Sequence, residues 1–401
     1  MGFHILALVL IAASIAILSP CTPGRTDPQT GRVRVLYVGQ WYFGGKPLYL
    51  VEDPLLRTSI VPYHDFGAQL DQIRRYMHLR YPRTKGHMTD SYDMVIFSNI
   101  QLLAFTPRQI QMAAEAVLED GLGYMMSGGH TSFGGTTDSY PSWEGSWIGE
   151  ILPVGLIDGQ YMKPYYFDLV VTDAENELMA SLPWSAIPPF SYSLNAVTMR
   201  QGGQLLAKTR VDGWPILAYG DFGKGRTLAF MTPFMDSDLD NYNMREWGYF
   251  EDLCANIAYY GAGIDLPDDH VTVHELRKLF RSYHDHALLF LSMVEFIDRF
   301  GVSTGPLEDM LEEVEGIRAS SYEAYISQEY GESSRLMRDA LEGLKEGSGR
   351  AVEIKNRALL WVYVIEYLVV TATLMVTGSL VWTLMVRRRL YRDVASTRMV
   401  G

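Results

Sequence analysis

An apolar run near the C-terminus constrains this chain more than any other feature. Residues 358–386 contain one charged side chain, Glu366, and the run is followed directly by Arg387, Arg388 and Arg389. An α-helix rises about 1.5 Å per residue, so roughly 20 apolar residues are enough to cross a bilayer. The run therefore predicts a transmembrane helix at 358–386.

The charges beside this helix predict its orientation. The tail 387–401 carries five Arg and one Asp, and basic flanks stay on the cytoplasmic side of a membrane. We therefore expect a basic cytoplasmic tail. Glu366 lies about 31 Å along the axis from Arg387 at the usual helical rise, which places it at the outer interface. We interpret it as an interfacial or helix-pairing side chain rather than a proton relay.

A second, shorter apolar run lies near the N-terminus. Residues 5–18 have the length of a signal-peptide core rather than of a membrane span. We expect residues 1–20 to be a signal peptide or an uncleaved N-terminal anchor. The segment before Cys21 resembles a lipoprotein cleavage box, although Pro20 stands where a small residue is usual, and lipidation of Cys21 stays open. In either case the bulk of the chain is expected outside the cytoplasm, as a single-pass protein of the cell membrane.

Composition limits the partners and the means of stabilisation. The net charge is −13, which argues against nucleic acid and anionic lipid surfaces as partners. The two cysteines, Cys21 and Cys254, cannot form a disulfide framework within one domain. The exported part must therefore be stabilised by a hydrophobic core, and it is long enough to bury one.

Residues 32–263 alternate strand-like and helical segments, as layered α/β domains do. Residues 33–38 and 92–99 are apolar runs of the kind buried in a parallel sheet. Thr106-Pro107-Arg108-Gln109 predicts a helix start with a capping box, and residues 123–127 predict the next strand. The pattern indicates a mainly parallel sheet with helices.

Two further β-runs, 214–219 and 226–231, flank a glycine-rich turn and predict a hairpin. That turn is no phosphate-binding P-loop, because its Lys-Gly continues into a strand. A helix over about 246–260 is expected to close the domain.

The β pattern ends after the α/β region. From 270 to 357 the sequence is helical, and one seam repeats at spacings of four and three residues: Leu276, Phe280, Tyr283, Ala287, Phe290, Val294 and Ile297. Breaks are expected at 301–305, at Gly331 and at 347–349. The region is strongly acidic, so we predict an acidic helical stalk or bundle. Residues 270–386 are also the expected contact with a membrane-protein partner or a second copy.

A glycine-rich loop follows the strand at 123–127. Ligands of open α/β sheets gather outside the carboxyl ends of the strands, and glycine amides there can bind anions or an oxyanion. From this topology we expect a ligand-binding site, for a small molecule, that comprises Gln40, Trp41, Asn99, Gln101, Gly128, Gly129 and His130.

An ordered series of motifs in this region resembles a known family. The motifs are YDMVIFSNI, FTPRQ, GLGYMMSGGHTSFGG, EILPVGL, AYGDFGKGRTLAFMTPFMDS and WGYFEDLCANIAYY. Together they are similar to the glutamine amidotransferase-like family, which is related to the ThuA-like proteins. The resemblance covers roughly residues 32–263 and implies a class I amidotransferase-like, flavodoxin-like fold of three layers.

The family resemblance raises the question of the nucleophile. Class I amidotransferases attack glutamine with a thiolate that lies on the turn after a central strand and is activated by a His. This chain has Gly128 and Gly129 at that turn. Cys254 lies instead between Leu253 and Ile257 in a helical stretch, which predicts a buried structural thiol. Glutaminase chemistry is therefore not expected.

Other candidate catalytic and metal-binding residues are weaker. Ser132 follows His130 in a loop that departs from the Gly-x-Ser-x-Gly elbow. Residues 236–240 alternate carboxylates like a calcium loop but lack its glycine and its final Glu. His270 and His274 can share a helix face but have no evident third ligand. We expect no metal site and no cofactor, and we take such helix histidines as surface groups.

Two hypotheses follow from these residues. The first is a membrane-anchored extracytoplasmic domain that lacks the nucleophilic Cys, a pseudoenzyme that binds a ligand or partner within a membrane assembly. The alternative is an extracytoplasmic hydrolase or sugar-related, ThuA-like enzyme that uses His130 with Ser132 or Asp236.

Overall fold

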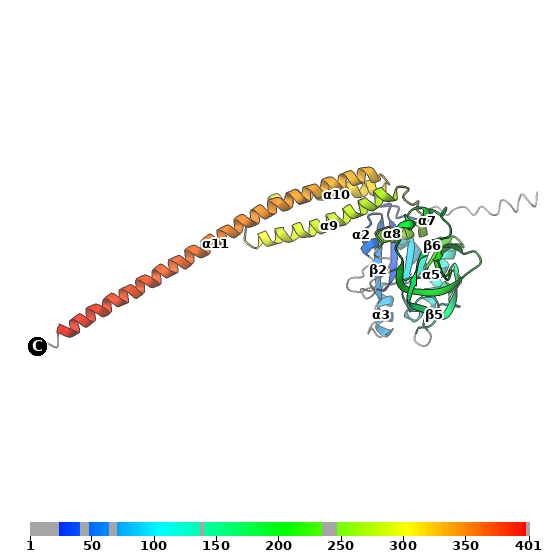
Figure 1. Cartoon of the computed structure of the whole chain (residues 1–401), viewed down its shortest axis with the longest axis horizontal. Helices are drawn as coiled ribbons and strands as arrows, with labels where there is room; N and C mark the ends of the chain where they lie inside the picture. Colours follow the sequence, from blue (N-terminus) through cyan, green and yellow to red (C-terminus); the bar gives the residue numbers. More distant parts are fainter. Residues whose placement is uncertain (1–23, 41–47, 64–69, 137–139, 235–246, 398–401) are drawn as a thin grey trace, which may run out of the picture. The chain divides into compact units, whose positions relative to one another are not determined.

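The structure is a computed structural model that describes residues 24–40, 48–63, 70–136, 140–234 and 247–397. The chain divides into two compact units, shown in Figure 1. The first unit comprises Met1–Arg277 and Tyr322–Ser333, and the second comprises Lys278–Ser321 and Ser334–Gly401. Each unit is described by itself.

An eight-stranded sheet is the centre of the first unit. In spatial order its strands are β2 (Leu56–Tyr63), β1 (Val33–Gln40), β3 (Met94–Ser98), β4 (Gly123–Ser127), β10 (Gly225–Phe230), β9 (Pro215–Phe222), β8 (Gln204–Thr209) and β6 (Leu169–Val171). From β2 to β10 all neighbours pair in parallel, and from β10 to β6 they pair antiparallel. The mainly parallel α/β sheet expected from the sequence is confirmed.

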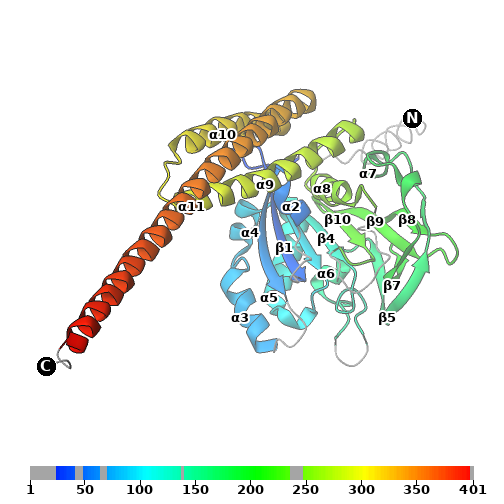
Figure 2. The same ribbon diagram turned by 60° about the vertical axis from the view of Figure 1, so that its left-hand side comes forward.

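Helices flank this sheet in two groups (Figure 2). The described helices of the first unit, in chain order, are α2 (Leu48–Glu52), α3 (Leu70–Arg80), α4 (Lys85–Ser91), η1 (Leu102–Ala104), α5 (Pro107–Asp120), α6 (Trp147–Glu150), α7 (Glu177–Ala180), η2 (Trp184–Ala186) and α8 (Phe250–Gly261). α2 packs beside α8, and α4 packs beside α5. Every residue of β3 and β4 is buried, as expected for strands covered on both faces.

The local signals of the sequence explain most of these elements. The Thr106 side chain accepts from the Gln109 amide at the start of α5, and the Gln109 side chain accepts from the Thr106 amide, so the expected capping box is present. α5 ends at Gly121, whose φ of 75° suits a left-handed cap. The expected hairpin is confirmed as β9 and β10, joined with Phe222 opposite Gly225.

Several strands of the structure were not predicted from the sequence. β2 is an edge strand that contains Arg57 and Pro62, so it lacks a continuous apolar run. β5 (Val154–Phe167) and β7 (Phe190–Met199) form a separate two-stranded ribbon whose register shifts twice. Such bulges break the alternation of period two by which strands are recognised.

A buried ionic cluster joins the sheet side of the first unit to the start of α9 (His270–Asp298). The Arg277 Nε donates to Asp53 Oδ2 at 3.0 Å, and its Nη1 donates to Asp252 Oδ1 at 2.6 Å. All three side chains are buried. One guanidinium therefore neutralises two carboxylates from positions far apart in the sequence.

Phenol and imidazole groups complete the cluster. The Tyr259 hydroxyl donates to Asp53 Oδ1 at 2.5 Å, and the Tyr325 hydroxyl donates to Asp53 Oδ2 at 3.0 Å. His274 Nδ1 lies 2.7 Å from Asp252 Oδ2, and its ring stacks on Tyr249. His274 is 8% exposed, so the expectation that it is a surface group is wrong. Its burial follows from the pairing with a carboxylate, which periodicity does not reveal.

The second unit consists of long helices: most of α9, α10 (Gly305–Ile326) and α11 (Tyr330–Thr397). The seam expected on α9 is confirmed, because Phe280, Tyr283, Phe290 and Ile297 are buried. The expected break at 301–305 is confirmed between α9 and α10, and a break at 327–329 lies directly before Gly331, but the break expected at 347–349 is absent because α11 is continuous there. A Cβ on Gly347 would lie 3.1 Å from the Phe290 ring, so this glycine admits a close helix contact rather than ending a helix.

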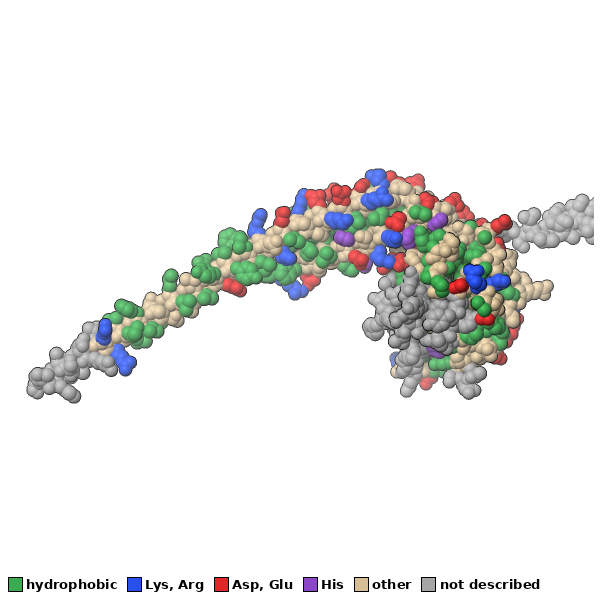
Figure 3. All heavy atoms as spheres, viewed as in Figure 1, with side chains coloured by type: hydrophobic (Ala, Val, Ile, Leu, Met, Phe, Trp, Pro, Cys, Tyr) green, Lys and Arg blue, Asp and Glu red, His purple; other side chains and the backbone are tan. Residues whose placement is uncertain are grey.

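One described helix, spanning Tyr330–Arg389, is long and apolar enough to cross a membrane by length and composition. Its most apolar window has a mean hydropathy of 2.0 and is not buried within the molecule. Figure 3 shows hydrophobic side chains covering the helix between its charged stretches. The candidate span expected at 358–386 lies within it.

We predict that Arg277→Met destabilises the first unit by about 3–5 kcal/mol, because removing one partner leaves buried carboxylates uncompensated. Amide hydrogen exchange of β1 and α8 measures this loss. Arg210→Met is the matched control: Arg210 pairs with Asp168 at 3.4 Å on the surface, and an exposed pair contributes under about 1 kcal/mol. Equal losses in the two variants would contradict a stabilising role of the cluster.

Candidate functional site

Three neighbouring parallel strands end at one edge of the sheet. Gly39 of β1 is paired with Ser98 of β3, which is in turn paired with Ser127 of β4. The residues that follow these strands therefore meet at the carboxyl edge, as the sequence topology predicts. We refer to this region as the carboxyl-edge site.

Asn99 is the centre of the carboxyl-edge site. Its Nδ2 donates to Gln40 Oε1 at 2.8 Å and lies 3.4 Å from His130 Nδ1. Its Oδ1 accepts from the amide and the hydroxyl of Thr131, at 3.1 and 2.9 Å. The backbone has a φ of 46°, an uncommon conformation that Asn tolerates better than most residues. The side chain thus joins β1, β3 and the glycine loop.

A second amide, Asn195 of β7, holds the loop from the other side. Its Oδ1 accepts from the Gly129 amide at 2.8 Å, and its Nδ2 donates to the Gly129 carbonyl at 3.0 Å and the Ser132 carbonyl at 3.4 Å. The sequence reading missed Asn195 because it lies within a strand that had no clear signal. One signal could have identified this residue: Asn195 lies between apolar neighbours, and a polar side chain that is buried among apolar ones needs hydrogen-bond partners.

The two glycines at the expected nucleophile position allow a close approach of the backbone, and their amide groups are not free to donate to a ligand. The Gly128 amide donates to the carbonyls of Phe230 and Thr232, at 2.7 and 3.0 Å, and the Gly129 amide donates to Asn195. A Cβ on Gly128 would lie 2.3 Å from the Met231 carbonyl oxygen. Both amides are engaged within the protein, so neither provides the oxyanion donor considered from the sequence.

His130 and Ser132 do not form a catalytic pair in the structure. His130 is partly exposed, with its ring against Tyr140 and Tyr161 at centroid distances of 5.2 and 6.2 Å. Ser132 is 1% exposed, and its hydroxyl has no hydrogen-bond partner among the described residues. A nucleophile must reach both a base and the substrate, and the buried Ser132 hydroxyl reaches neither.

The other expected site residues lie as follows. The Gln101 side chain is buried and donates to the Tyr63 hydroxyl at 2.8 Å, so it lies at the same edge but faces β2. Trp41 and Asp236, together with the remaining carboxylates of 236–240, lie outside the described residues. Within the part of the chain that is described, no three His, Cys, Asp or Glu side chains gather to hold a metal ion.

Cys254 is a buried thiol on α8. It is 1% exposed, and burial, reinforced by the charges of Glu251 and Asp252, raises the pKa of the thiol well above its ordinary value. A protonated, inaccessible thiol is a poor nucleophile. The interpretation of Cys254 as structural is confirmed.

Fold and site together define a flavodoxin-like α/β domain with a glycine turn at the carboxyl edge. The model of the family described as "Putative glutamine amidotransferase" matches residues 79–260, so this segment is similar to that family, and the resemblance found in the sequence is confirmed. A search of curated proteins found no match.

Solved structures similar to this chain include two proteins of one organism. Cytoplasmic Protein STM1381 from Salmonella typhimurium LT2 is 20% identical, with a TM-score of 0.46 and coverage of 57% of this chain and 99% of that chain. Cytoplasmic Protein STM3548 from Salmonella typhimurium is 17% identical, with a TM-score of 0.46 and coverage of 57% and 98%.

We predict that Gly129→Ala destabilises the first unit more than Gly145→Ala. Both glycines have positive φ, 137° and 70°, so both variants incur backbone strain of about 1–2 kcal/mol. Only at Gly129 would the new Cβ meet another side chain, Asn99, at 2.2 Å, and such overpacking adds about 1–3 kcal/mol. Pulse proteolysis in urea compares the two. Equal stabilities would show that Asn99 moves aside freely.

Proposed function

We propose that this chain is a membrane-anchored, non-catalytic amidotransferase-like protein that recognises a ligand or partner at the carboxyl-edge site. The observation that carries the proposal is the turn after β4. Gly128 and Gly129 stand where the family's nucleophile is expected, and their amides are engaged within the protein. The buried Cys254 thiol offers no replacement.

The exposed part of the carboxyl-edge site favours recognition over chemistry. Gln40, Asn99 and Gln101 are buried, so they stabilise this edge of the sheet from inside the protein. His130, Tyr140 and Tyr161 are partly exposed, and these rings present aromatic surface to an incoming ligand. Aromatic side chains fixed by packing provide large contact area at low entropic cost, as recognition surfaces require.

Anchoring and orientation are part of the proposal. The apolar stretch of α11 ends at three consecutive arginines, Arg387 to Arg389, which supports a cytoplasmic C-terminus. The α/β unit is then held on the opposite side of the membrane by the helices between 270 and 357. A membrane-protein partner or a second copy of the chain is proposed to pair along residues 270–386.

The catalytic alternative is tested on purified full-length protein in detergent micelles. With glutamine and with a panel of aryl esters, we expect product formation no faster than in buffer, for the wild type and for His130→Ala alike, because the Ser132 hydroxyl and the Cys254 thiol are both buried. The exposed His87 on α4 supplies the control variant, His87→Ala. Turnover that His130→Ala abolishes and His87→Ala retains would establish the hydrolase instead.

Recognition is tested with the same protein in its native membrane. A photo-crosslinking amino acid placed at Tyr161 is expected to give a discrete adduct, because this ring lies at the proposed contact. Placement at Tyr219, on the opposite part of the sheet and in edge-to-face contact with Tyr260, is expected to give none. Identical adduct patterns at both positions would count against a specific carboxyl-edge site.

Orientation predicts the accessibility of introduced thiols. In a Cys21→Ser background, Val211→Cys, at a position 88% exposed, is expected to react with a membrane-impermeant maleimide on intact cells. Arg388→Cys is expected to react only after permeabilisation, while the native Cys254 stays buried. Labelling of Arg388→Cys and not of Val211→Cys on intact cells would reverse the proposed topology.

A further inference from the structure

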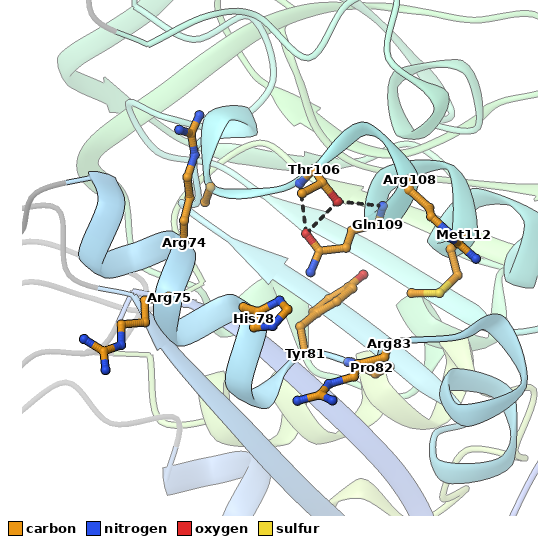
Figure 4. Close-up of a pocket in the computed structure, with 11 residues that line it drawn as sticks. Arg74, Arg75, His78, Tyr81, Pro82, Arg83, Thr106, Arg108, Gln109 and Met112 are labelled. Carbon is orange, nitrogen blue, oxygen red and sulfur yellow. Dashed lines mark hydrogen bonds between the residues drawn. The ribbon is translucent and has the colours of Figure 1, made fainter.

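A basic cavity lies apart from the carboxyl-edge site, between α3 and the start of α5. Its volume is about 570 Å³, within the usual range of small-molecule pockets. Figure 4 shows side chains from α3, from the segment after it and from the first turns of α5 surrounding the hollow. None of the residues expected from the sequence to bind a ligand lines it.

The cavity concentrates positive charge in an acidic protein. Four arginines, Arg74, Arg75, Arg83 and Arg108, line it together with His78, and no Asp or Glu is among the lining residues. The whole chain carries a net charge of −13. Like charges gathered in one concave site repel one another and attract an anion, whose binding relieves that repulsion.

These arginines are placed for anion binding rather than for internal pairing. The Arg74 Nε donates to the Leu103 carbonyl at 3.0 Å, which fixes its guanidinium beside the cavity. Arg75, Arg83 and Arg108 form no ion pair within the described part of the chain. Guanidinium forks match phosphate and carboxylate oxygens in bidentate geometry. The lining therefore includes three exposed guanidinium groups that no described carboxylate neutralises.

A buried donor at the cavity wall is also unsatisfied. Tyr81 lines the cavity and is 2% exposed, and its hydroxyl has no hydrogen-bond partner among the described residues. The ring is fixed against Phe97 and Phe105. Burial raises the pKa of this phenol far above its ordinary value, so it remains a donor. Figure 4 shows the hydroxyl directed toward Gln109 and Met112.

We propose that this cavity binds a small polyanion, a molecule with two or more phosphate or carboxylate groups. A single inorganic ion leaves most of about 570 Å³ unfilled, whereas two anionic groups can engage arginines on both walls. The proposal is independent of the function assigned to the carboxyl-edge site.

The test uses full-length protein in a non-ionic detergent and isothermal titration with pyrophosphate and with citrate. We expect saturable one-site binding of at least one of the two, weakened when salt is raised from low to physiological concentration. The preference between pyrophosphate and citrate distinguishes a phosphate ligand from a carboxylate ligand. Absence of saturable binding of both probes would overturn the proposal.

Three variants localise the binding. Arg83→Gln/Arg108→Gln is expected to weaken binding at least tenfold, and Arg210→Gln, which removes an exposed arginine outside the cavity, is expected to leave it within twofold. Tyr81→Phe removes only a hydroxyl that is closed off from solvent, so it is expected to retain the fold and to leave binding within twofold. Equal binding by the wild type and the double variant, or tighter binding of a single-stranded oligonucleotide than of either probe, would overturn the site.

Discussion

The pairing of Arg277 with Asp53 and Asp252 is the interaction on which the first unit depends. These residues come from the segment after α2, from α8 and from the start of α9, and they meet in a region from which water is excluded. A buried charge is tolerated only when it is paired and hydrogen-bonded. The hydroxyls of Tyr259 and Tyr325 supply the remaining bonds to Asp53. The connection between α10 and α11 is thereby fastened to the α/β domain itself.

The carboxyl edge is stabilised by a different device, two buried amides. Asn99 binds Gln40 and Thr131, and Asn195 binds Gly129 through both its oxygen and its nitrogen. In an enzyme of this fold the same turn carries a reactive side chain that must remain free to move protons. Here the amides of Gly128 and Gly129 are both used to fix the backbone of the turn. Such pre-organisation lowers the entropic cost of binding a ligand at this edge.

The sequence predicted the fold further than it predicted the site. Apolar runs and the capping box at Thr106 specify β3, α5 and β4 because those signals are local. The pairing of Asp53 with Arg277 joins residues more than two hundred positions apart, so no periodicity encodes it. Asn195 was missed for the same reason, since its partner Gly129 lies on another element. Trp41 and Asp236 fall outside the described residues and stay predictions.

The basic cavity shows why net charge is a poor guide to local chemistry. A value of −13 argues against polyanionic surfaces as partners of the whole chain, yet Arg74, Arg75, Arg83 and Arg108 gather at one hollow. The acidic residues are concentrated elsewhere, notably on α10. Beyond a Debye length of about 8 Å at physiological salt, exposed charges are screened from one another. A small anion inside the cavity therefore interacts mainly with the arginines, and the net charge of the chain has little effect on it. An extended polyanion interacts with the arginines and is also repelled by the acidic surface.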